Sequence, residues 1–151
     1  ITGGNSGICL GMAEALAQPL DRFAVPLLAR RWKRLKRDAK GLEQLDATGL
    51  HELRLDAKRL RYAAEMFAPL WPGKGTRRFL KRLAALQEVL GLANDAAVAR
   101  ALVAHLAARP ALRWAVGAAE GWAAARTGSI RQDVIQAWDR LSAEDPFWPG
   151  D

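Results

Sequence analysis

The sequence is poor in the residues that several protein classes require. It has a single cysteine, Cys9, in 151 residues, which excludes a disulfide framework and a cysteine-rich zinc site. Its thirteen glycines recur without a period, which excludes collagen. No apolar run approaches the ~20 residues of a membrane span, and the first residues lack the pattern of a signal peptide. We therefore expect a cytoplasmic protein that does not associate with membranes.

The residues that are abundant indicate a folded, helical chain. Hydrophobic residues make up 50% of the sequence and charged residues 26%, which excludes a disordered protein. β-Branched residues are scattered and no long stretch alternates apolar and polar residues, so strands are not expected. The length predicts one domain, residues 1–151. We predict helices over residues 11–45 (broken near Pro19 and Pro26), 48–70, 76–90, 95–109 and 110–141, with irregular ends at 1–11 and 142–151.

The boundary between the third and fourth predicted helices depends on three neighbouring residues. Gly91 follows the last apolar residue of the third helix and is expected to end it. Asn94 or Asp95 is then expected to cap the fourth helix, because short polar side chains accept hydrogen bonds from the first free backbone N–H groups of a helix.

Positive charge is concentrated in one part of the chain. The formal net charge is +7 and the pI is near 10.3. Sixteen of the 23 lysines and arginines lie between Arg30 and Arg82, whereas six basic and seven acidic residues follow from Gly91 to the end. A localised positive field predicts a binding surface for a polyanion.

The predicted helix over 48–70 places its cations between two apolar arcs. At 100° per residue, one apolar arc holds Leu50, Leu53, Ala57, Leu60, Ala64 and Phe67, and a second holds Leu55, Tyr62 and Met66. The arc between them holds His51, Arg54, Lys58 and Arg61. The remaining face carries Glu52, Asp56 and Arg59, so Arg59 is expected to point outward. Cations flanked by apolar arcs on both sides are expected to line a groove or pore between helices.

The same spacing of cations occurs in the preceding helix. Arg30, Lys33, Arg37 and Lys40 repeat the offsets of His51, Arg54, Lys58 and Arg61, and each stripe extends roughly 15 Å along its helix. Like charges at these spacings destabilise an isolated helix, and a bound polyanion would offset that repulsion. With two cations from the third helix, the candidate phosphate contacts are His51, Arg54, Lys58, Arg61, Arg77, Lys81, Lys33, Arg37, Arg30 and Lys40.

Two segments resemble the signatures of a known family. The segment over 51–62, HELRLDAKRLRY, resembles the first signature of the CHAD domain, the conserved-histidine α-helical domain. The segment over 81–95, KRLAALQEVLGLAND, resembles the second, and the resemblance extends over about 12–141. It implies an all-α bundle of long antiparallel helical hairpins with a basic groove. It also implies binding of inorganic polyphosphate, sometimes beside a CYTH-type triphosphatase, with a location at polyphosphate granules.

Family members usually carry two such repeats, whereas this sequence contains one, which resembles the C-terminal copy. His105 is the other histidine of the chain and lacks the flanking pattern, so we expect it to have no binding role and to lie at the surface or in the core. A second copy of the chain could complete the channel, which makes a homodimer one expected arrangement.

The sequence leaves three other functions to consider. A nucleic-acid-binding module could use the same basic patch. A metal-dependent phosphohydrolase could hold Mg²⁺ between Glu65 and Glu88, although we expect these to pair with Arg61 and Lys81. The turn over 2–9 resembles that of short-chain dehydrogenases, but no βαβ pattern follows it. We therefore expect non-catalytic binding of polyphosphate, without a cofactor, a metal site or catalytic residues.

Overall fold

A computed structural model describes residues 6–106 and 113–150, and within them the chain is entirely helical. No strand occurs in this part of the chain, so the predicted all-α fold is confirmed. The elements are α1 (Ser6–Asp38), the short 3₁₀ helix η1 (Leu42–Gln44), α2 (Ala47–Phe67), the 3₁₀ helix η2 (Ala68–Leu70), α3 (Lys74–Leu106) and α4 (Arg113–Ser142).

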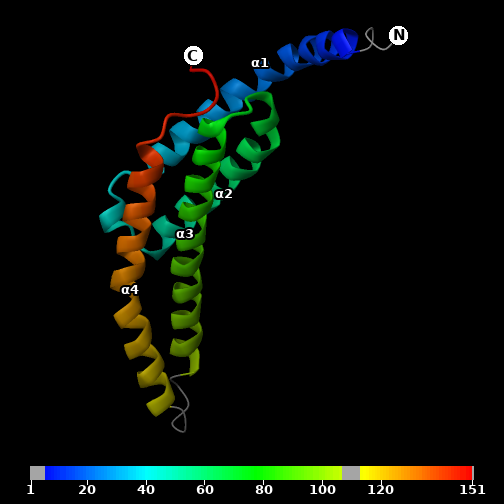
Figure 1. Cartoon of the computed structure of the whole chain (residues 1–151). Helices are drawn as coiled ribbons and strands as arrows, with labels where there is room; N and C mark the ends of the chain where they lie inside the picture. The colour runs from blue at the N-terminus through cyan, green and yellow to red at the C-terminus, as the bar shows by residue number, and fades with distance from the viewer. Residues whose placement is uncertain (1–5, 107–112, 151) are drawn as a thin grey trace.

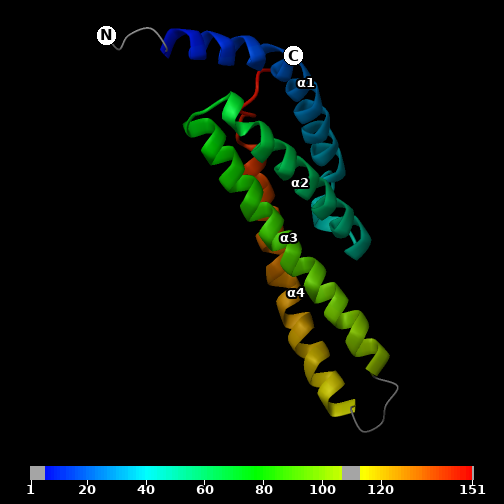
Figure 2. The same cartoon turned by 90° about the vertical axis from the view of Figure 1, so that its right-hand side faces the viewer.

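The helices form a long hairpin with two further helices packed at one end. Figure 1 shows α3 and α4 running antiparallel along their length. Helix α2 lies between α1 and α3, and the segment after α4 turns back across the same end of the bundle (Figures 1 and 2). The first turns of α1 project away from the bundle. No helix within the described ranges is long and apolar enough to cross a membrane.

The core lies where all four helices meet. The apolar seam of α3, formed by Phe79, Leu83, Leu86 and Leu90, is fully buried. Phe79 packs edge to face against Trp32 of α1 and Trp148 of the C-terminal segment, with ring centroids 5.4 and 5.3 Å apart. Edge-to-face aromatic contacts add to the free energy of apolar burial. Leu53 and Leu60 of α2 are also fully buried, as the wheel predicts. The core therefore fixes which faces of α1, α2 and α3 remain available for other contacts.

The predicted break between the third and fourth helices is wrong. Residues Gly91, Asn94 and Asp95 all lie inside α3, which continues from Lys74 to Leu106. A glycine inside a helix costs only about 1 kcal/mol relative to alanine, and burial of Leu90 and Ala93 on either side of Gly91 outweighs that cost. Asn94 therefore has its side chain free for a tertiary contact instead of a cap.

Helix α1 also differs from its predicted bounds. It begins at Ser6, inside the stretch expected to be irregular, and it continues through Pro19 and Pro26. A proline removes one hydrogen bond and bends a helix, and Figure 2 shows α1 bent rather than interrupted. The helix ends at Asp38 because Gly41 adopts φ 70°, a left-handed conformation that glycine tolerates best.

The remaining boundaries follow local signals. Asp46 caps α2, since its carboxylate accepts a hydrogen bond of 2.8 Å from the backbone N–H of Gly49. Residues 143–150 form no helix, although Trp148 is buried. Most of the predicted glycine-rich turn, residues 2–5, lies outside the described residues.

Candidate functional site

The α2 stripe, defined as His51, Arg54, Lys58 and Arg61, lies on the side of α2 that faces α3. His51 Nδ1 lies 2.9 Å from Asn94 Oδ1, and Arg61 Nη1 donates to Gln87 Oε1 over 3.3 Å. Both partners on α3 are amides, which orient a side chain without adding charge. These contacts with α3 therefore position His51 and Arg61 without adding negative charge.

Arg54 lies between His51 and Lys58 in the α2 stripe, and one of its N–H donors has no partner among the described residues. Its Nε atom is buried and makes no hydrogen bond within the described part of the chain. A buried N–H donor without an acceptor costs roughly 1–3 kcal/mol, and more when the group is charged. Because this Nε is shielded from solvent, an anion over α2 would supply the missing acceptor once the Arg54 side chain turns toward it.

Lys58 and Arg61 each contact a neighbouring residue of α2 that lies beside the stripe, Tyr62 and Glu65 respectively. The ammonium of Lys58 lies 5.6 Å from the ring centre of Tyr62, within cation–π range. Arg61 Nε donates to Glu65 over 2.6 Å, so the predicted pairing of these two residues is confirmed. The predicted pairing of Lys81 with Glu88 is not found among the described residues, where both side chains are exposed.

The opposite side of α2 contains the Asp56 cluster, which we define as Asp56, Arg34 and Arg59. The sequence analysis placed Asp56 and Arg59 on the remaining face of the helix. Asp56 is only 3% exposed, and its two oxygens accept hydrogen bonds of 2.8 Å from Arg34 Nε and Arg59 Nη1. Arg59 itself is 49% exposed, as expected, but it pairs with Asp56, which is buried because this face of α2 packs against α1. No pattern in the sequence signals an ion pair between residues 22 positions apart.

A cavity opens between α1 and α2 beside this cluster. Its volume is about 410 Å³. We call it the α1–α2 cavity, and its lining residues are Leu27, Arg30, Arg31, Arg34, Glu52, Asp56 and Arg59. Of the ten predicted contacts only Arg30 lines it. Arg31, one of the lining residues, has a buried Nε without a hydrogen-bond partner among the described residues. Sequence reasoning missed this site because Arg31 and Arg34 fall outside the repeated spacing.

The other members of the α1 stripe point away from α2. Lys33, Arg37 and Lys40 are exposed, on the side of α1 remote from its buried leucines. Arg37 Nε donates to Asp38 over 2.7 Å. This hydrogen bond raises the pKa of Arg37. The same hydrogen bond, together with the positive charges of Arg37 and Arg34, lowers the pKa of Asp38. The α1 and α2 stripes thus lie on different faces and do not line one groove, because α1 packs on the Asp56 side of α2.

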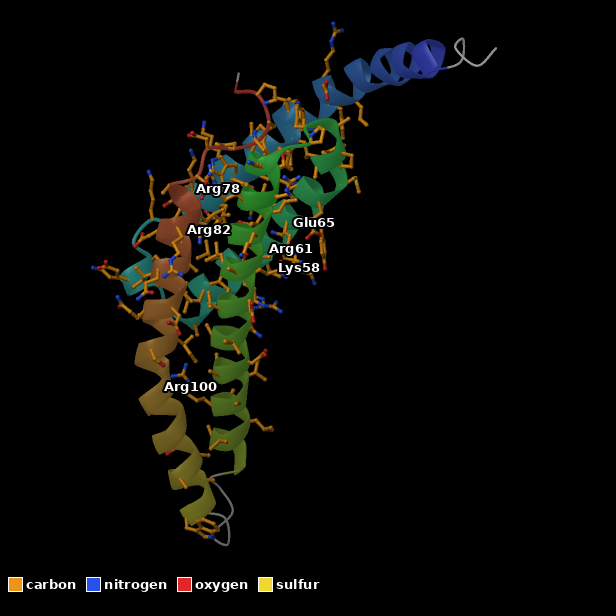
Figure 3. The ribbon with its side chains drawn as sticks, viewed as in Figure 1. Lys58, Arg61, Glu65, Arg78, Arg82 and Arg100 are labelled. Carbon is orange, nitrogen blue, oxygen red and sulfur yellow. The ribbon has the colours of Figure 1, made fainter. Side chains whose placement is uncertain are left out.

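The cations of α3 divide between two sides of that helix. Arg77 and Lys81 are exposed and make no ion pair within the described ranges. Arg78 and Arg82 pair instead with Glu144 beyond α4. Figure 3 shows Arg78 and Arg82 on one side of α3, and Lys58, Arg61 and Glu65 on the other.

The described residues contain no group of three or more histidine, cysteine and carboxylate side chains placed to hold a metal ion. The side chain of His105 lies outside them, so the expectation for that residue stays a prediction. One further arginine, which the sequence analysis did not single out, fixes the local geometry. Arg131 of α4 donates to the carbonyls of Leu42, Glu43 and Leu45 and holds the turn between α1 and α2.

Comparison with protein families identifies the group to which this arrangement belongs. A family model described as the CHAD domain matches residues 7–104, which is more than half of the chain. The chain belongs to the CHAD domain family. The resemblance seen in the sequence is thus confirmed. The resemblance was expected to extend over about 12–141, whereas the match ends at residue 104 and does not include α4. No similarity to a curated protein or to a solved structure was found.

In this CHAD domain the two signature segments contact each other. The hydrogen bonds from His51 to Asn94 and from Arg61 to Gln87 both join the segment over 51–62 to the segment over 81–95. The two motifs therefore form one unit across α2 and α3, in which the first supplies the cations and the second supplies the amides that orient two of them.

Proposed function

We propose that this CHAD domain binds inorganic polyphosphate along the α2 stripe without transforming it. The observation that carries the proposal is Arg54, whose Nε is buried without an acceptor between two cations that amides hold in place. Membership of the CHAD family, whose signature segments imply polyphosphate binding, supports the same ligand.

The spacing of the α2 stripe suits a linear polyanion. Its members follow one another over roughly 15 Å of the helix, so successive phosphoryl groups of an extended chain can each meet a cation. Arg54 offers a planar guanidinium group, which suits two phosphoryl oxygens at once, whereas Arg61 already donates to Glu65 and Gln87 and keeps its remaining N–H groups for phosphate. With Nδ1 directed to Asn94, a protonated His51 has Nε2 free to donate to phosphate.

Single-stranded nucleic acid is a second candidate, and one observation favours it. Tyr62 is 57% exposed and lies beside Lys58, where its ring could stack with a base. Stacking platforms in single-strand binding proteins usually follow one another along the backbone path. Tyr62 is the one aromatic ring that the structure places at the α2 stripe, within the described residues. We therefore favour polyphosphate, which has no bases to stack.

A charge-reversal series tests the proposal. Arg54→Glu, Lys58→Glu and Arg61→Glu together should weaken binding of long-chain polyphosphate by at least about 100-fold, because the binding free energy comes mainly from cation–phosphate contacts. A matched control reverses three exposed cations elsewhere, Arg22, Lys74 and Arg140, and should weaken binding by no more than about threefold. Isothermal titration at fixed salt measures both. Equal losses in the two triple variants would contradict the assignment of the α2 stripe.

A turnover assay tests the absence of catalysis. The protein incubated with polyphosphate or nucleoside triphosphates and Mg²⁺ should release no phosphate above background. Metal-dependent release that disappears in Glu65→Gln or Glu88→Gln would instead establish the phosphohydrolase.

A further inference from the structure

The α1–α2 cavity differs from the α2 stripe in the arrangement of its cations. Three of its arginines come from little more than one turn of α1, and Arg59 approaches from α2. They surround one buried carboxylate, Asp56, instead of following one another along a helix. A cluster of this kind suits a compact anion, whereas a row of cations suits an extended one.

The charge of the cavity lining is positive. Four arginines stand against two carboxylates, Glu52 and Asp56, so two positive charges are in excess. Glu52 is exposed and makes no ion pair within the described chain. A compact anion with two or more negative charges would balance this excess.

Asp56 orients two of the arginines. It accepts one N–H from Arg34 and one from Arg59, both at 2.8 Å, while each guanidinium carries five N–H groups in a fixed plane. Arg34 Nε also lies 3.7 Å from Asp38, so the N–H groups available for a second acceptor are those that neither carboxylate engages. Arg31 adds a buried Nε that has no acceptor among the described residues, and such a donor is costly to leave unpaired. The cavity thus has oriented donors and excess positive charge, and one of its lining arginines carries an unpaired donor.

We propose that the α1–α2 cavity is a second anion site, separate from the α2 stripe, that binds a compact inorganic phosphate such as pyrophosphate. The volume of about 410 Å³ lies within the range of small-molecule sites. Leu27 is the one apolar side chain in the lining, so the site favours the phosphate group itself over a ligand with a large apolar part. The opposite sides of α2 carry the two sites, with Asp56 facing α1 and Gln87 and Asn94 contacting the stripe from α3.

Titration with pyrophosphate tests this site directly. The double variant Arg30→Gln with Arg31→Gln removes two lining cations that make no ion pair within the described residues, so the Asp56 cluster stays intact. It should weaken pyrophosphate binding by at least about tenfold. The control Lys74→Gln with Arg140→Gln removes the same charge elsewhere and should leave binding within about twofold. Equal losses in both doubles, or no pyrophosphate binding by the wild-type chain, would overturn the proposal.

A gain of affinity provides a second test. Glu52→Gln removes one negative charge from the lining and should tighten pyrophosphate binding by about threefold. Unchanged affinity in Glu52→Gln would contradict binding inside the cavity. This variant breaks no ion pair in the described chain, so its fold should be retained.

The same chemistry has two sources, a free short phosphate and the end of a long polyphosphate chain. If chain ends bind in the cavity, Arg30→Gln with Arg31→Gln weakens binding of long chains with free ends but not of chains whose terminal phosphates are blocked as amides. If free pyrophosphate is the ligand, both long chains bind that variant alike while pyrophosphate binding falls. Failure here is distinguishable from failure of the proposed function, because the α2-stripe variants are tested with long chains and the cavity variants with pyrophosphate.

Discussion

The two sides of α2 hold their cations in different ways. Toward α3, neutral amides orient His51 and Arg61, and Arg61 also pairs with Glu65 of its own helix. Toward α1, the buried carboxylate of Asp56 binds Arg34 and Arg59. A carboxylate neutralises the cation that it positions, whereas an amide positions the cation and leaves its charge for a ligand. The charges of Arg34, Arg59 and Arg61 are thus compensated by carboxylates. Arg54 and Lys58 make no ion pair within the described residues, so the charge available to a ligand on the α3 side comes mainly from these two.

The largest difference that we expect between the two sides is in stability. Asp56→Asn breaks two ion pairs around a buried group and should lower the free energy of unfolding by about 1–2 kcal/mol, reduced from the value for fully buried pairs because both arginines are half exposed. Arg54→Met removes a buried donor without an acceptor and should leave stability unchanged or raise it while weakening polyphosphate binding. Urea denaturation measures both free energies, and a larger loss in Arg54→Met than in Asp56→Asn would contradict the comparison.

The apolar residues at the rim of the stripe should give a smaller effect on self-association. Tyr62 and Met66 are 57% and 72% exposed, and the second apolar arc of α2 is thus only partly covered. Exposed apolar side chains that lie together usually mark an interface, which agrees with the expectation that a second copy completes the polyphosphate site. Tyr62→Ser with Met66→Ser should weaken dimer formation measured by sedimentation velocity. A chain that stays monomeric at high concentration, before any substitution, removes the basis for this prediction.

The smallest expected effect concerns pH and the α1 side of the bundle. The hydrogen bond from Arg37 lowers the pKa of Asp38 in the folded chain, relative to about 3.9 in the unfolded chain. The resulting stabilisation is therefore fully present above that pH and is lost as the pH falls through the lower folded pKa. Denaturation at several pH values should show this acid-dependent component in the wild type and a weaker one in Asp38→Asn. An identical slope in both proteins would exclude Asp38 as its source.

Periodicity predicted the buried faces because burial repeats with the helix. The arc that contains Leu53 and Leu60 is buried as the wheel indicates, and the order of charged residues on α2 follows from the same geometry. The signature segments also pointed to the two helices that meet through His51 and Asn94. These features could be predicted because each depends on spacing within one helix.

Contacts between distant parts of the chain could not be predicted in this way. The sequence pattern predicts that Asp56 is a surface residue, but the packing of α1 buries it. Nothing in the sequence around Arg131 indicates that it binds the turn after α1. Gly91 is a helix-ending residue by local preference, yet the buried seam of α3 carries the helix through it. In each case tertiary packing decided the outcome.

Competition between polyphosphate and RNA tests the central claim most directly. The α2 stripe is a row of cations with Tyr62 as its neighbouring aromatic ring, so long polyphosphate should displace single-stranded RNA at equal phosphate concentration and not the reverse. The preference should persist at about 0.15 M salt, where exposed charges are already screened, while the affinity itself falls with added salt. Displacement of bound polyphosphate by RNA at equal phosphate concentration would contradict the account and identify this surface as a nucleic-acid-binding site.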